Sequence, residues 1–124
     1  MADLDFTSAM IGTEQPDTLG EFYATVLGRP ADMKEQGMYG WRFSSTFLSI
    51  VQHSEVKGRA AEPQRVILNL QTPDVQGEFE RIKSSGATVV HEPYDFEGTM
   101  QVATFADPDG NYFQLMSPFE EPGS

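Results

Sequence analysis

The spacing of apolar residues predicts an amphipathic helix in the first quarter of the chain. After Pro16, apolar residues recur three and four positions apart, which places them on one face of a helix. They are Leu19, Phe22, Tyr23, Val26 and Leu27. Proline suits the first turn of a helix, and Gly28 suits the position just past its end. We therefore predict a helix over residues 16–27.

A second apolar stripe predicts a second helix. It consists of Val75, Phe79 and Ile82 and ends before Gly86. Thr72 is the expected N-cap and Pro73 the expected first helical residue. This stripe predicts a helix over residues 73–85.

Short apolar and β-branched runs around the two helices predict strands. In the first half they cover residues 5–12, 38–43 and 46–52. In the second half they cover residues 65–71, 87–91, 101–105 and 112–116. Residues 92–98 are predicted to be a loop, and residues 107–110 (Asp-Pro-Asp-Gly) a hairpin turn.

The pattern Pro-Asp-x-x-Gly-Glu-Phe occurs twice, at residues 16–22 and 73–79. Each copy follows a predicted strand and opens a predicted helix, which indicates a duplicated strand-helix-three-strand unit. We predict a single α+β domain over residues 1–124. This domain consists of module one at 5–57, a linker at 58–64, module two at 65–118 and an acidic tail at 119–124.

Composition narrows the classes of partner. The formal net charge of −11 argues against nucleic acid, which is bound mainly through Lys and Arg. The charge favours solubility or, alternatively, attraction of a cationic ligand. Cysteine is absent, so disulfides and thiolate metal sites are excluded. The chain has no apolar run of about 20 residues and no signal-peptide pattern at its start, which predicts a cytoplasmic protein without a membrane partner.

Two segments resemble the glyoxalase / bleomycin-resistance / extradiol-dioxygenase superfamily, also called the vicinal oxygen chelate (VOC) proteins. They are Phe-Tyr-Ala-Thr-Val-Leu-Gly at 22–28 and Phe-Ala-Asp-Pro-Asp-Gly-Asn-Tyr-Phe-Gln-Leu at 105–115. The resemblance implies two βαβββ modules, a curved open sheet around a cleft with helices outside, and a homodimer. It does not imply one reaction, because a fold hosts many functions.

The resemblance also implies where a metal would bind. Metal-using members place His, Glu or Gln on the first strand of each module and Glu on the last. The corresponding positions here are Ser8, Ser49, Ile67 and Gln114. Hard divalent ions need carboxylate or imidazole ligands, and one neutral amide cannot replace them. We therefore predict no metal and no other cofactor.

Strand alternation separates helix-facing residues from cleft-facing residues. Val66, Leu68, Leu70, Phe113 and Leu115 are predicted to face a helix. The predicted ligand-binding residues are Met10, Trp41, Phe47, Ser49, Asn69, Tyr112 and Gln114. They mix apolar, aromatic and neutral polar groups, as small-molecule sites commonly do. The alternative is that the large side chains only fill the sheet or a dimer contact.

The sequence offers only weak candidates for catalysis: His53, Glu55 and Tyr94. His53 and His91 are both predicted at strand ends, where hydrogen bonds to loops are the simpler interpretation. We predict a metal-free protein that binds a small molecule, with sequestration of an aromatic or cationic compound as one form of that function. One alternative is a lyase, isomerase or dioxygenase of the same superfamily with an atypical metal site or general acid/base residues. The other is an interaction protein with a vestigial cleft.

Overall fold

The computed structural model describes residues 4–98 and 100–118. Its contacts divide the chain into two compact units between Gly58 and Arg59. The first unit contains β1 (Ser8–Thr13), α1 (Pro16–Leu27), β2 (Met33–Glu35), β3 (Met38–Arg42) and β4 (Phe47–Gln52). The second contains β5 (Leu68–Gln71), α2 (Val75–Ser84), β6 (Thr88–Phe96), β7 (Met100–Ala106) and β8 (Tyr112–Met116). Both units therefore have the predicted βαβββ order.

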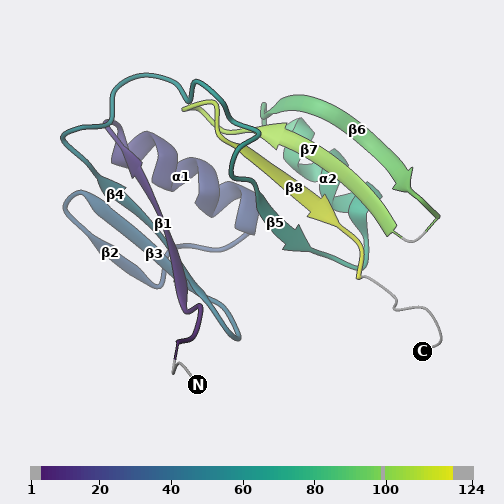
Figure 1. Ribbon diagram of the computed structural model, residues 1–124, viewed down its shortest axis with the longest axis horizontal. Helices are drawn as coiled ribbons and strands as arrows, with labels where there is room; N and C mark the ends of the chain where they lie inside the picture. Colours follow the sequence, from purple (N-terminus) through teal and green to yellow (C-terminus); the bar gives the residue numbers. More distant parts are fainter. Residues whose placement is uncertain (1–3, 99, 119–124) are drawn as a thin grey trace. The chain divides into compact units, whose positions relative to one another are not determined.

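The two units also share one sheet topology. The strand orders are β1-β4-β3-β2 and β5-β8-β7-β6, and each helix runs across one face of its own sheet (Figure 1). In each sheet the first and last strands pair in parallel, while the other neighbours are antiparallel. This arrangement confirms the predicted α+β fold. Neither described helix combines the length and hydrophobicity that crossing a membrane requires.

In the first unit, α1 forms over the residues that its apolar spacing predicts. Gly28 ends the helix with a left-handed φ of 72°, a conformation that costs glycine little. The buried face of α1 packs over the first sheet. The largest buried apolar side chains of this core are Leu19, Tyr23, Val26, Tyr39, Trp41, Leu48 and Ile50.

In the second unit, α2 begins two residues later than predicted. Asp74 is its N-cap, and its carboxylate accepts a hydrogen bond from the Gly77 amide. Thr72 is not the cap, because its hydroxyl accepts from the Asp74 amide and forms a turn before the helix. The buried stripe of α2 is the predicted one, and it packs with Phe105, Phe113 and Leu115 of the sheet.

Several strand boundaries differ from the predictions. β6 continues to Phe96 through most of the predicted loop, because two register shifts let its irregular segment stay paired with β7. β2 was not predicted, since its three residues are all exposed and carry no apolar pattern. β5 begins only at Leu68, so Val66 is 75% exposed and does not face the helix. The predicted acidic tail lies outside the described residues.

Candidate functional site

Each sheet has one face against its helix and one opposite face, which we call the distal face. In β8, Phe113 and Leu115 are buried toward α2, whereas Tyr112, Gln114 and Met116 are only half-buried and alternate with them. This alternation is the predicted one. It assigns Gln114 to the distal face of the second sheet.

A row of polar side chains crosses the distal face of the second sheet. Successive strands bring Asn69 beside Gln114, Gln114 beside Thr104, and Thr104 beside His91. Residues paired in this way on neighbouring strands project to the same face. The Gln114 amide Nε2 donates to the Thr104 hydroxyl over 3.1 Å. We call Asn69, Gln114, Thr104 and His91 the polar row.

His91 belongs to this row because β6 is longer than predicted. The sequence placed His91 at a strand end, but the structure places it within β6, opposite Thr104. Its ring centroid lies 4.5 Å from that of Tyr94, and its Nδ1 lies 3.0 Å from the carbonyl oxygen of Glu92. Sequence reasoning did not select His91 or Thr104 for the site. Alternation with Phe105 was a signal that could have found Thr104.

The distal face of the first sheet is more apolar. Met10, Ser49 and Gly40 are neighbours across β1, β4 and β3, and Met10 is 64% exposed. The Phe47 ring lies where a side chain on Gly40 would stand, so the glycine makes room for it. The Arg42 guanidinium lies 5.6 Å from the centroid of the same ring. Met10, Phe47 and Ser49 thus share the face predicted for them.

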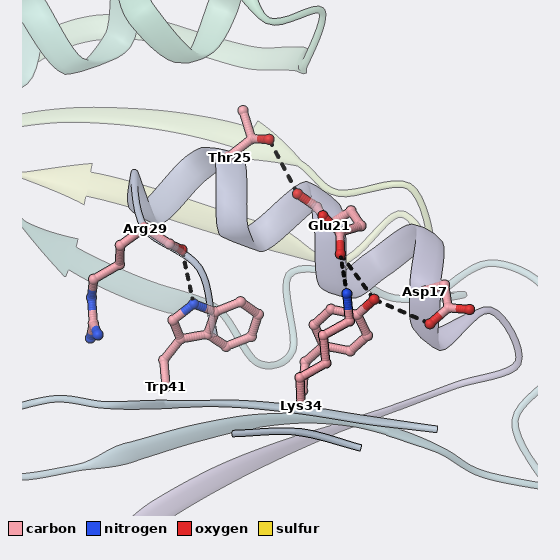
Figure 2. A network of polar contacts seen from close by, with 7 residues as sticks. Asp17, Glu21, Thr25, Arg29, Lys34 and Trp41 are labelled. Atoms are coloured by element: carbon pink, nitrogen blue, oxygen red, sulfur yellow. Dashed lines mark hydrogen bonds and ion pairs between the residues drawn. The ribbon is translucent and has the colours of Figure 1, made fainter. Parts of the chain in front are cut away.

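Trp41 does not share that face, and its predicted place in the ligand-binding set is wrong. It pairs with Leu48, which is buried on the helix side, and it has no exposed surface. Its indole N–H donates to the carbonyl oxygen of Arg29, just past the end of α1 (Figure 2). The reason is strand parity: in β3, Gly40 and Arg42 point distally, so Trp41 must point to the helix.

The weak catalytic candidates divide between the units. His53 and Glu55 are exposed in the turn after β4, where the His53 Nδ1 accepts from the Glu55 amide over 3.1 Å. Tyr94 stands in β6 of the second unit, beside His91. His53 therefore forms the hydrogen bond to a loop that was expected for it. Tyr94 contacts His91, which the sequence did not indicate.

The donor groups on the distal faces do not fit a metal site of the VOC type. Ile67 precedes β5, so Asn69 is the distal-face residue that stands beside Gln114. In the first sheet, Met10 stands beside Ser49. In residues 4–98 and 100–118, no three His, Cys, Asp or Glu side chains come together as a metal site would require. Thioether, hydroxyl and amide groups supply no negative charge for a hard divalent ion.

A separate polar cluster joins α1 to the first sheet on its helix side. The Tyr39 hydroxyl lies 3.2 Å from an Asp17 oxygen and 3.0 Å from a Glu21 oxygen, and the Lys34 Nζ lies 3.3 Å from Glu21 (Figure 2). The Tyr39 hydrogen bond, followed by Lys34, lowers the pKa of Glu21. Burial, followed by the neighbouring carboxylates, raises the pKa of Tyr39.

This helix-side cluster borders a shallow hollow of about 470 Å³. Glu21, Arg29 and Lys34 line the hollow, and all three are already engaged in ion pairs within the first unit. These pairs satisfy the local charges internally. We therefore interpret the cluster as a set of structural contacts that hold α1 against the first sheet.

The comparison with protein families decides which group this fold represents. Residues 8–116 match the profile of the glyoxalase-like domain. The chain belongs to the glyoxalase-like domain family. This confirms the VOC resemblance seen in the sequence. No curated protein is significantly similar to this glyoxalase-like chain.

Solved structures share the fold of this glyoxalase-like chain. A glyoxalase-related enzyme from Fulvimarina pelagi has a TM-score of 0.77 at 16% identity, over 97% of this chain and 95% of that one. A glyoxalase/bleomycin resistance protein/dioxygenase family enzyme from Burkholderia phytofirmans PsJN has a TM-score of 0.75 at 19% identity, over 92% and 98%. A glyoxalase/bleomycin resistance protein/dioxygenase from Nocardioides gives 0.74 at 18%, over 100% and 91%. At such identities the likeness supports the fold alone.

Proposed function

We propose that this glyoxalase-like chain binds a small organic molecule without a resident metal ion. The polar row on the second sheet is the observation that carries the proposal. It combines amide, hydroxyl and imidazole groups with the half-buried Tyr94, Tyr112 and Met116 on one face. A few placed polar groups among apolar and aromatic ones are the usual composition of a small-molecule site.

The distal face of the first sheet is a separate surface that suits apolar ligand groups. Met10 exposes 64% of its surface, and Phe47 is half-buried beneath Arg42. A thioether and an aromatic face suit contact with flat apolar ligands. Ser49 adds one hydroxyl between them. We therefore retain Met10, Phe47 and Ser49 as proposed ligand contacts of the first unit, retain Asn69, Tyr112 and Gln114 as those of the second unit, and remove Trp41.

Metal analysis and thermal denaturation test the proposal. A small-molecule ligand at a hundred times its dissociation constant should stabilise the native state by about 2.7 kcal/mol. Ni²⁺, Zn²⁺, Mn²⁺ and Fe²⁺ should give no comparable shift. Gln114→Ala should weaken ligand binding, whereas Gln76→Ala, on the exposed surface of α2, should not. Stoichiometric metal in the purified protein that Gln114→Ala removes would overturn the proposal.

The contact between His91 and Tyr94 favours one second candidate function. An exposed imidazole beside a phenol could exchange a proton with a bound molecule, as an isomerase or lyase requires. Incubation with bound ligand in D₂O tests this, with deuterium incorporation measured by mass spectrometry. Deuterium incorporation that His91→Ala abolishes would support an enzymatic function. Equal incorporation in both proteins, or none in either, would contradict it.

A further inference from the structure

We propose that the polar row accepts hydrogen bonds from its ligand. The ligand is therefore a molecule that carries N–H donors, such as an amide, amine or amidine. The inference rests on the proposed function and names the ligand class for the same site. Its basis is that Gln114 and His91 each donate one hydrogen bond to a protein group, and each is left with an acceptor atom for a ligand.

Gln114 supplies the first acceptor. A carboxamide has one face that donates, through Nε2, and one that accepts, through Oε1. Thr104 on β7 accepts an Nε2 hydrogen at 3.1 Å, so Oε1 is the amide atom that this contact leaves for a ligand; Asn69 is the neighbour of Gln114 on the other side, in β5. Thr104 is only 6% exposed, which holds its hydroxyl in place. Thr104 is thus a positioning residue that sets which atom of Gln114 meets the ligand.

His91 supplies the second acceptor by the same logic. A carbonyl oxygen can only accept, so the 3.0 Å contact with the Glu92 oxygen requires the hydrogen to be on Nδ1. In the neutral ring, Nε2 then carries a lone pair. His91 is exposed, so this lone pair is open to a ligand. Two strands of one row therefore present acceptors.

The remaining features favour the same ligand class. Asn69 is exposed beside Gln114, and its amide can turn to accept or to donate as the ligand requires. The net charge of −11 attracts cations and repels anions at long range. A carboxylate bound at the row would place its lone pairs against those of Gln114 and His91. An N–H group would meet complementary partners.

Nuclear magnetic resonance of the ¹⁵N-labelled full chain tests the assignment of donors and acceptors without a ligand. Long-range ¹H–¹⁵N spectra should show the Nδ1-protonated form of the His91 ring. One Gln114 side-chain proton should exchange slowly in the native protein and in Thr104→Ser, which keeps the hydroxyl. Thr104→Val has the same shape without the hydroxyl, and this protection should be lost. An Nε2-protonated His91, or an unchanged Gln114 signal in Thr104→Val, would overturn the argument.

Three probes of one shape then test the ligand class: benzamidine and benzamide, which carry N–H donors, and benzoate, which does not. Both N–H probes should shift the signals of Gln114 and His91 saturably, with benzoate at least about tenfold weaker. Thr104→Val should weaken benzamide binding by about threefold to tenfold, while Thr104→Ser stays within about twofold. Binding unchanged in Thr104→Val would remove the positioning role.

A wider fragment set separates this inference from the proposed function. Benzoate that binds as tightly as benzamide, or aromatic fragments without N–H groups that shift the row more strongly, would overturn the ligand class and leave small-molecule binding intact. If the three probes and the wider set shift no distal-face signal, both proposals fail together.

Discussion

Replacing Gly20 by alanine should destabilise the first unit, although the same change usually stabilises a helix. Gly20 and Gly77 occupy the same position in the two copies of Pro-Asp-x-x-Gly-Glu-Phe. A β-carbon on Gly20 would lie 2.5–2.6 Å from three atoms of the Tyr39 ring. The three atoms nearest to a β-carbon on Gly77 would all belong to the exposed carboxylate of Asp74. The duplicated motif therefore contains its own matched control.

The Tyr39 ring has little freedom to move away from the new methyl group. It stacks near Trp41 with centroids 6.2 Å apart, and its hydroxyl is held by Asp17 and Glu21. Overpacking of this kind costs about 1–3 kcal/mol of folding stability. We expect a cost of about 3 kcal/mol, because the new methyl group overlaps a Tyr39 ring that has little freedom to move away. The higher helix propensity of alanine stabilises the helix by about 1 kcal/mol relative to glycine. The net loss should be about 2 kcal/mol.

For Gly77→Ala the two effects should nearly cancel. Loss of the Asp74 cap costs about 1 kcal/mol, and alanine returns about the same amount. Urea denaturation followed by fluorescence of Trp41, the sole tryptophan, reports the first unit, and circular dichroism reports the helices and strands of both units together. At typical slopes of about 1–3 kcal/mol per M, Gly20→Ala should lower the urea midpoint of the first unit by about 0.7–2 M.

A double-mutant cycle identifies the cause. Tyr39→Leu removes the ring, so Gly20→Ala should cost much less in that background. A Gly20→Ala protein as stable as Gly77→Ala would refute the reasoning. So would a cost that stays the same in the Tyr39→Leu background.

Three further outcomes are expected. Burial raises the pKa of Tyr39 in the folded state above its ordinary value of 10.0. The stability that protonated Tyr39 contributes is therefore complete below pH 10.0 and is lost as the pH rises through the raised pKa. Above pH 10.0, the urea midpoint of the native protein should fall relative to that of Tyr39→Phe. Asp74→Ala should cost about 1 kcal/mol by urea denaturation, since α2 loses its side-chain cap, and a change under about 0.3 kcal/mol would contradict the cap. We also propose a homodimer, supported by the exposed apolar side chains of Leu4 and Phe6. Light scattering at high micromolar concentration should show two copies, and Phe6→Glu should reduce the dimer. A monomeric native protein would count against the proposal.

The sequence predicted elements whose signals are local. Apolar spacing located α1 at both ends, and the alternation of Tyr112 to Met116 located β8 and its two faces. Gln114 and Asn69 were selected by the same parity argument. Trp41 was assigned by its chemistry rather than by parity, and the structure turns it to the helix. The end of β6 could not be predicted, because a strand with register shifts lacks regular alternation.

What the sequence alone determined is the duplicated βαβββ unit and its family, because helix and strand periods and the repeated motif are properties of neighbouring residues. Only the tertiary structure decided which polar groups meet. Parallel pairing of β5 with β8 brings Asn69 beside Gln114, and the continued β6 brings His91 opposite Thr104. Those contacts join segments far apart in the chain. No local pattern encodes which side chains these pairings bring together, and the hydrogen bond from Gln114 to Thr104 on the neighbouring strand leaves the Gln114 Oε1 as an acceptor.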